Sequence, residues 1–180
     1  MNIKNHILEG IKLSLSSNHD DRPENSEISL IVVHSISLPP TIFGNNYVEE
    51  FFLNKLPVTD NSYLNIIRDM KVSPHLYIKR SGEIIQFVPF DKRAWHAGQS
   101  SFENIKNCND YSIGIELEGC EDIVYENIQY IKLSEIINSL LGSYKSLSLN
   151  RIVSHSDIAP GRKSDPGPLF DWKRLKTMIK

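Results

Sequence analysis

The feature that most constrains the fold is a short apolar run, ISLIVVHS, at residues 28–35. Its series of apolar, mostly β-branched residues predicts a buried strand, which we expect to end at His34. Further strand-like stretches lie at residues 75–89, 111–119 and 151–155. The chain is therefore expected to build its core around a β-sheet.

Two of these stretches carry more detailed patterns. Residues 111–119, YSIGIELEG, alternate apolar side chains with small or charged ones, and this period of two places Glu116 and Glu118 on the same face of a strand. Residues 75–89 predict a hairpin that turns at Gly82, because glycine supplies the positive φ that a tight turn needs.

Helical patterns accompany the strands, at residues 47–56, 127–141 and 170–179. Strands mixed with helices over 180 residues predict the α/β class, with a single domain and a central mixed β-sheet flanked by helices. Residues 1–27 are expected to be an N-terminal extension that packs on the domain formed by residues 28–180. The second half of this extension, rich in Asn, Asp and Ser, is expected to approach the first strand along the surface.

Composition excludes several classes of protein. With 40% hydrophobic and 23% charged residues the balance is that of a globular domain, and the net charge of −2 gives no reason to expect nucleic acid or an anionic membrane as partner. The N-terminal segment lacks the apolar core of a signal peptide, since Glu9 and Lys12 interrupt it, so we expect a cytoplasmic protein. Cys108 and Cys120 have no CxxC spacing and are expected to be free thiols.

Two predicted strands end in histidine, at His34 and His155. Taken singly, such a histidine is more often satisfied by hydrogen bonds than bound to a metal. The loop over residues 154–168 changes this balance, because its prolines and glycines exclude a continuous helix or strand and would fold Asp165 back towards His155. Two imidazoles and one carboxylate are a ligand set for catalytic zinc. Asp157 competes for the carboxylate position, although a turn-forming role suits it better.

A zinc-bound water needs a base and a nearby cation. Lys163 is a candidate for the cation that stabilises a developing negative oxygen, although on its own it would be interpreted as a solvated lysine. Glu116 is the candidate base, since burial within an apolar strand would raise its pKa. Glu118 shares its face, and both glutamates could instead be ordinary charges of an edge strand.

The segment DKRAWHAG, residues 91–98, brings Arg93, Trp95 and His96 together in an apparent loop. This combination suits a polar ligand with an apolar or sugar-ring face and an anionic end. Trp95 could equally cap the core, as most tryptophans do. His75, at the start of the predicted hairpin, is expected to be structural or to lie at the edge of the site.

Four segments together resemble a known family: LIVVHSISLPP, VSPHLYIKRSGEIIQFVPFDKRAWHAG, CNDYSIGIELEG and SHSDIAPGRKSDPGPLFDW. They are similar to the zinc-dependent N-acetylmuramoyl-L-alanine amidases of the amidase-2 type, from Ser29 to Trp172. The resemblance implies the mixed sheet of peptidoglycan-recognition domains. It also implies a Zn²⁺ cofactor and hydrolysis of the lactyl amide between (1,6-anhydro)-N-acetylmuramic acid and L-alanine of muropeptides, in peptidoglycan recycling. Residues 28–180 would be the catalytic domain of a monomer whose partner is this small substrate.

The resemblance also implies a role for each site residue. The metal ligands would be His34, His155 and Asp165, the catalytic glutamate Glu116 and the transition-state lysine Lys163.

Three positions depart from the family pattern. Pro74 stands where related amidases use a tyrosine, which places more weight on the catalytic glutamate. Lys71 and Asn107 stand where arginines would bind the carboxylates of the peptide stem. Lysine keeps the charge without the bidentate geometry, and asparagine loses the charge, so these two substrate-binding positions are altered.

Other functions are consistent with parts of this pattern. A muropeptide-binding domain that does not cleave would commonly lack a metal ligand, whereas this chain has the full set. A secreted amidase acting on whole peptidoglycan would need an export signal. A structural zinc protein would need a fourth protein ligand.

Overall fold

The computed structural model describes residues 1–180 and is built around a six-stranded mixed sheet with strand order β12-β5-β11-β6-β7-β3. In that order the strands are β12 (Ile152–Ser154), β5 (Leu30–Ile36), β11 (Ser112–Glu118), β6 (Leu76–Ile78), β7 (Ile84–Gln86) and β3 (Lys12–Leu13). Every neighbouring pair is parallel except β6 and β7, which form the expected antiparallel hairpin. The predicted central mixed sheet is thus confirmed.

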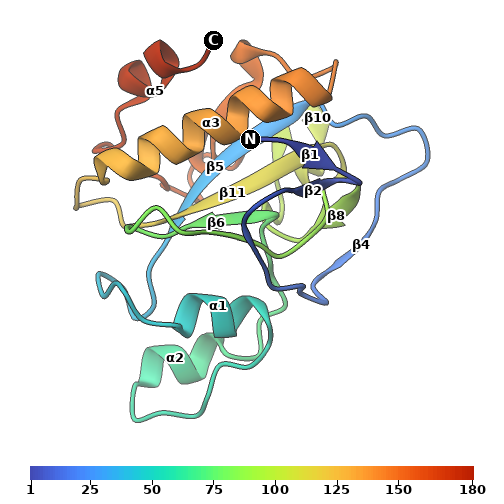
Figure 1. Ribbon diagram of the computed structural model, residues 1–180. Helices are drawn as coiled ribbons and strands as arrows, with labels where there is room; N and C mark the ends of the chain where they lie inside the picture. Colours follow the sequence, from blue (N-terminus) through green and yellow to red (C-terminus); the bar gives the residue numbers. More distant parts are fainter.

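Helices lie on both sides of this sheet (Figure 1). The long helix α3 (Asn127–Ser143) crosses one face with α5 (Trp172–Met178) beside it, whereas α1 (Tyr47–Phe52) and α2 (Ser62–Ile67) lie at the opposite face. The shorter elements are β1 (Ile3–Lys4), β2 (Ile7–Leu8), β4 (His19–Asp21), β8 (Lys92–Ala94), β9 (Ser101–Phe102), β10 (Ile105–Lys106), α4 (His155–Ile158) and the 3₁₀ turns η1 (Cys108–Asp110) and η2 (Leu149–Arg151).

The two central strands divide their side chains between two cores. Ile31 and Val33 of β5, with the isoleucines of β11, belong to the core that includes α3. Alternation sends the intervening residues to the other face. His34 and Glu116 follow this rule, and they stand opposite each other in the parallel register of β5 and β11. A polar pair is therefore placed side by side in the middle of an apolar sheet.

Several predicted boundaries were wrong. The strand expected to end at His34 continues to Ile36, because β11 pairs with it over its full length. The helix expected to reach residue 56 ends at Phe52, where Asn54 adopts a left-handed φ of 57°. Helix α3 extends past its expected end, Leu141, to Ser143. Helix α2 was not predicted at all.

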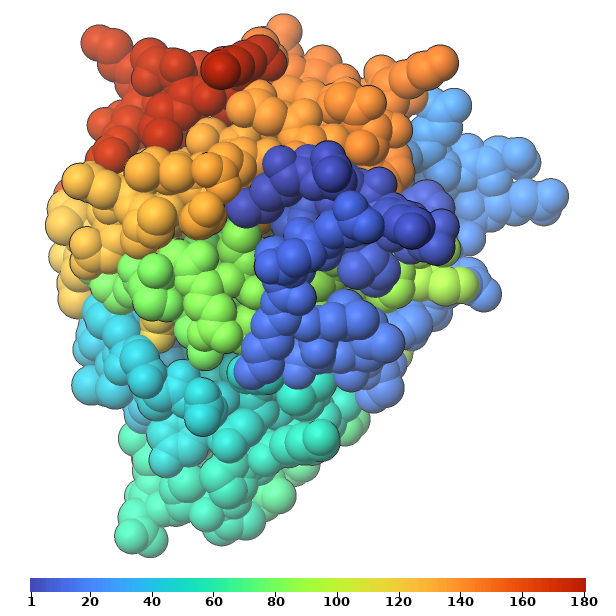
Figure 2. Space-filling model, in the orientation of Figure 1, coloured from blue at the N-terminus to red at the C-terminus, as the bar shows by residue number.

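The N-terminal segment takes part in the sheets. Strand β3 is an edge strand of the central sheet, and β4 pairs with β8. Residues 91–98 are therefore not simply the expected loop, since β8 lies within them. In Figure 2 the first residues, in dark blue, lie across the green β6–β7 region, between α3 above and the α1–α2 region below.

Arg22 shows that the polar stretch before β5 is more than a surface approach. Its guanidinium donates hydrogen bonds to four backbone carbonyls, those of Phe90, Asn109, Asp110 and Ser112. Burial lowers the pKa of Arg22 to about 10. One side chain thus ties the N-terminal segment to the start of β11.

Replacing Arg22 with alanine is expected to reduce the free energy of unfolding by roughly 3 kcal/mol, because several buried carbonyls lose their donor. Urea unfolding followed by circular dichroism measures this change. Arg68→Ala is the matched control, since that side chain is half-buried and its one recorded ion pair, with Asp69, is long at 4.0 Å. A change for Arg22→Ala no larger than for the control would contradict the anchoring role.

Candidate metal centre and active site

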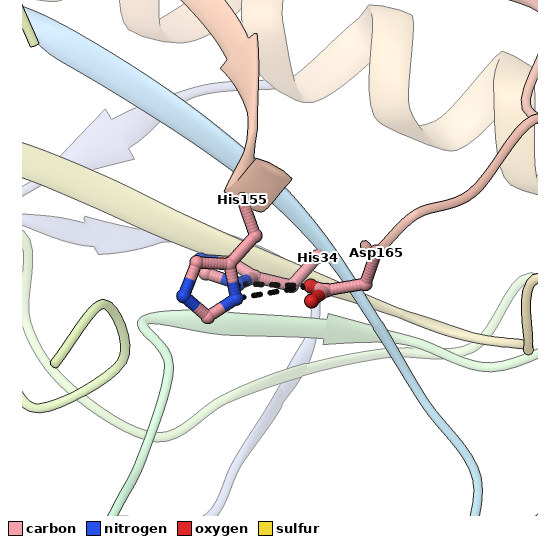
Figure 3. Close-up of side chains that lie close together, drawn as sticks. All are labelled: His34, His155 and Asp165. Carbon is pink, nitrogen blue, oxygen red and sulfur yellow. Dashed lines mark hydrogen bonds and ion pairs between the residues drawn. The ribbon is translucent and has the colours of Figure 1, made fainter. Parts of the chain in front are cut away.

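Three side chains from separate parts of the chain converge beside the central strands (Figure 3). His34 comes from β5, His155 begins α4, and Asp165 lies in the loop that follows. The Nδ1 atoms of the two histidines are 2.9 Å apart. Asp165 Oδ2 lies 3.1 Å from His155 Nδ1 and 3.3 Å from His34 Nδ1. The structure therefore brings together the three ligands that the sequence predicted.

Local structure fixes the positions of two of these ligands. Ser154 caps α4: its side chain accepts a hydrogen bond from the Asp157 amide, and the Asp157 carboxylate accepts one from the Ser154 amide. Asp157 is thereby held in the cap and lies outside the cluster. The backbone of Ser156 donates to the carbonyl of Asp165 at 3.2 Å, which folds the loop back onto α4.

Hydrogen bonds on the outer side of the cluster orient the imidazoles. The Ala97 carbonyl can only accept, so His155 Nε2, 3.2 Å away, carries the proton and Nδ1 presents a lone pair to the cluster. Burial lowers the pKa of His34 to about 4, which keeps this ring neutral at physiological pH. Burial alone would raise the pKa of Asp165, but the imidazoles of His155 and His34 beside its Oδ2 lower it and hold the carboxyl ionised.

This donor set fits a zinc ion. Neutral imidazole nitrogens and a carboxylate oxygen are ordinary zinc ligands, and with bonds of 2.0–2.1 Å the corners of a tetrahedral site are about 3.3 Å apart. The separations of 2.9–3.3 Å between the three donor atoms match that spacing. Three such acceptors held at this spacing favour a shared cation.

A cavity of about 530 Å³ opens from the cluster, a volume common for small-molecule sites. Its polar end includes His155, Asp165, Glu116 and Lys163. Its other walls are largely apolar and include Leu38, Phe52, Tyr63, Ile67, Met70 and Trp95. The cavity therefore joins a charged end to a surface that suits an apolar or ring-shaped group.

Glu116 and Glu118 share a strand and a face but have different surroundings. Glu116 lines the cavity, and its buried Oε2 has no hydrogen-bond partner in the protein. Burial raises the pKa of Glu116 well above its usual value, and the charge of Asp165 adds to this effect. Glu118 is buried outside the cavity and accepts hydrogen bonds from the amides of Gly44 and Arg80. Of these two glutamates, only Glu116 has a carboxylate oxygen free for chemistry.

The family model described as N-acetylmuramoyl-L-alanine amidase matches residues 24–168. The chain belongs to this amidase family.

Individual relatives agree with the family assignment. The AmpD protein of Citrobacter freundii, named 1,6-anhydro-N-acetylmuramyl-L-alanine amidase, is 45% identical over 164 residues, covering 91% of this chain and 87% of the relative. A crystal structure of a selenomethionine AmpD derivative has a TM-score of 0.96 and 42% identity, and the match covers 100% of both chains. AmpDH3 from Pseudomonas aeruginosa, crystallised in complex with anhydromuramic pentapeptide, has a TM-score of 0.64 and 29% identity, covering 84% of this chain and 59% of that one.

The residues predicted to bind substrate in this amidase divide into two groups. Trp95 and His96 line the cavity. Arg93 does not, since its guanidinium pairs with Asp20 and Asp110. The other two predicted positions, Lys71 and Asn107, are exposed and also lie outside the cavity lining, so their roles stay predictions.

Sequence reasoning missed one cation of the cavity. Arg162 lines it and donates hydrogen bonds to the carbonyls of Ala97 and Gln99. Its place directly before Lys163 in the loop of residues 154–168 was the available signal. His75, by contrast, is structural as expected: its Nδ1 accepts from the Gly114 amide and its Nε2 donates to the carbonyl of Lys92.

The structure has no helix of the length and apolar character needed to cross a membrane.

The buried histidines of the amidase predict acid sensitivity. Burial lowers the pKa of His34 to about 4 and moves the pKa values of His75 and His96 well below 6.5. The unfolded chain, where these groups titrate near 6.5, therefore binds more protons than the folded protein below that pH. Their stabilisation is complete above about pH 6.5 and is lost as the pH falls. The raised pKa of Glu116 acts in the opposite direction, because the folded protein retains a proton on this carboxyl that the unfolded chain releases.

We therefore predict that the free energy of unfolding of the metal-free protein falls as the pH is lowered from about 7 to 5, because the three histidines take up more protons on unfolding than Glu116 releases. Urea unfolding at about pH 7, 6 and 5 measures this slope. A stability that does not change over this range would mean that the histidines are already charged in the folded protein.

Proposed function

We propose that this protein is a zinc-dependent amidase that hydrolyses the amide bond between the lactyl group of 1,6-anhydro-N-acetylmuramic acid and L-alanine of soluble muropeptides, in peptidoglycan recycling. The observation that carries the proposal is that two members of the ligand cluster, His155 and Asp165, line one cavity together with Lys163 and the unpaired carboxylate of Glu116. The substrate class is supported by the relatives, one named for this anhydro substrate and one crystallised with an anhydromuramic pentapeptide.

In this proposal His34, His155 and Asp165 hold the zinc ion. The chemistry supplied by the bound ion is a nucleophilic water at neutral pH, since zinc lowers the pKa of water from 15.7 to about 7. Three protein ligands leave one position of a tetrahedral site for that water. A purely structural zinc site would have this position closed by a fourth residue.

Glu116 is proposed as the general base and acid. Its free Oε2 accepts the proton of the attacking water and then returns a proton to the departing amine of L-alanine. The raised pKa of Glu116 suits the first step, because it makes this carboxylate a stronger base than an ordinary glutamate. Pro74 lines the cavity and has no side-chain proton to contribute, so this position cannot share the proton transfer with Glu116.

Lys163 is proposed to stabilise the negative charge that develops on the carbonyl oxygen during attack. Its side chain is exposed in the cavity and makes no hydrogen bond within the protein, so it is free to meet substrate. Trp95 and the neighbouring apolar wall would contact the sugar ring, since aromatic faces pack well against such rings.

We place the protein in the cytoplasm as a monomer, where soluble muropeptides reach it. The proposed catalytic residues all belong to residues 28–180, which we take as the catalytic domain. Residues 1–27 are proposed to be an extension that folds with this domain. Two contacts support this: β3 pairs with β7 at the edge of the central sheet, and Arg22 donates a hydrogen bond to the carbonyl of Ser112 in β11.

The experiment that tests the proposal is mass spectrometry of an anhydro-muramoyl tripeptide incubated with zinc-loaded or chelator-treated protein. We expect release of free tripeptide only by the zinc-loaded protein, and recovery of activity when zinc is restored. Intact peptidoglycan, tested in parallel, is expected to be a poor substrate. Binding of the muropeptide without cleavage, by protein shown to contain zinc, would overturn the proposal in favour of a recognition domain.

A further inference from the structure

A second imidazole stands directly behind one of the proposed metal ligands. His96 Nδ1 lies 2.8 Å from His34 Nε2, and the two rings meet edge to face with centroids 5.0 Å apart. The other nitrogen of His96, Nε2, lies 3.0 Å from the hydroxyl oxygen of Ser112. His34, His96 and Ser112 therefore form a continuous hydrogen-bonded chain that leads away from the metal cluster.

The space for this chain is provided by small residues of β11. Ser112 and Gly114 occupy alternate positions on the face of β11 that carries Glu116. A Cβ atom at Gly114 would lie only 2.4 Å from the His96 ring, which no native packing tolerates. The pattern SIGIE thus supplies one hydroxyl, one gap for the imidazole and one carboxylate in succession on a single face.

The direction of the protons along this chain follows from the metal site. His34 can offer the Nδ1 lone pair to a metal only when its proton sits on Nε2, and that proton then needs an acceptor. His96 Nδ1 is the acceptor within reach. His96 must then carry its own proton on Nε2, where the Ser112 oxygen accepts it. Each group in the chain determines the tautomer of the one before it.

We propose that His96 is a positioning residue, which together with Ser112 fixes the tautomer and ring orientation of His34 for metal binding. It acts through His34 and not by contact with substrate, whereas its place in residues 91–98 predicted a substrate-binding role. This inference rests on the proposed function only in that the metal is the zinc ion assigned there. Partners that hold a ligating histidine in this way typically change metal affinity by about 10-fold to 100-fold.

The test compares zinc affinity, measured by competition with a chromophoric chelator, across a set of single variants. His96→Ala is expected to weaken zinc binding by about 10-fold to 100-fold, and Ser112→Ala by less. His96→Gln should recover part of the loss, because its amide oxygen can accept the His34 proton. Gly114→Ala should weaken binding although it removes no polar group, because the new methyl group displaces the His96 imidazole.

Trp95→Phe is the matched control, since Trp95 is the chain neighbour of His96, lines the same cavity and makes no hydrogen bond to a proposed ligand. It is expected to raise KM for the muropeptide and to leave zinc affinity unchanged. His96→Ala is expected to weaken zinc binding and, when assayed at saturating zinc, to leave KM for the muropeptide unchanged. The visible spectrum of the cobalt-substituted protein should change for His96→Ala and stay unchanged for Trp95→Phe.

The outcomes separate this inference from the function on which it rests. Wild-type zinc affinity and an unchanged cobalt spectrum in His96→Ala, with a raised KM, would make His96 a substrate contact and overturn the inference while the amidase function stands. If His96→Ala fails to fold, the zinc affinities of Ser112→Ala and Gly114→Ala decide in its place, and wild-type values for both would overturn the inference. Failure of the wild-type protein to bind zinc would overturn both proposals.

Discussion

Replacing Glu116 with glutamine is expected to lower kcat by about 100-fold to 10,000-fold, the range for loss of a positioned general base. The amide has nearly the shape of the carboxylate but cannot accept a proton at neutral pH. Because the donors that hold the metal are untouched, zinc content should equal that of the wild-type protein. Steady-state kinetics with an anhydro-muramoyl peptide, together with metal analysis, measures both quantities.

Glu118→Gln is the matched control for this prediction. It removes a carboxylate from the same strand and the same face, but one that binds the amides of Gly44 and Arg80 and lies outside the cavity. Its kcat is expected to stay close to the wild-type value, with the cost appearing in thermal stability. Equal losses of kcat in the two variants would remove the special role of Glu116.

The pH profile gives an independent check of the same role. The base must be ionised for attack, so kcat should decline as the pH falls through the pKa of Glu116. Burial places this pKa well above 4.5, and the acidic limb should therefore lie well above that of an ordinary glutamate. The limb should be absent from the residual activity of Glu116→Gln.

Replacing Asp165 with asparagine is expected to weaken zinc binding by more than about 100-fold, because even the outer partners of zinc ligands cost up to that amount. The variant loses the only negative charge of the cluster and the acceptor that faces both His155 Nδ1 and His34 Nδ1. Activity at limiting zinc should fall in proportion. Zinc should raise the Tm of the wild-type protein and leave that of the variant unchanged, since a ligand stabilises only the state that binds it.

Asp157→Asn separates this effect from general damage to the loop. Asp157 is a carboxylate two residues beyond His155 that caps α4 and does not join the cluster. We expect a loss of about 1 kcal/mol in stability, as for other caps, with zinc affinity retained. Loss of zinc in Asp157→Asn, with zinc retained in Asp165→Asn, would instead make Asp157 the metal ligand.

Local sequence patterns predicted much of the fold correctly. Alternation along residues 111–119 was enough to place Glu116 on the face opposite the isoleucines, because side chains of a strand alternate whatever its neighbours are. The hairpin at Gly82 and the long helix were also recognisable from local chemistry. Helix α2 escaped detection, since its six residues SYLNII contribute only Leu64 to the buried set and show no helical repeat.

By itself the sequence determined which residue types were available for chemistry, and in what order along the chain. Two histidines followed by an aspartate in a loop rich in proline and glycine indicated a metal site, because few other arrangements need those residues together. The long-range partners were decided only by the tertiary structure. The parallel register of β5 and β11 sets Glu116 against His34, and packing across β11 seats the His96 imidazole between His34 and Ser112. These contacts join segments far apart in the chain, and no local pattern encodes their distances.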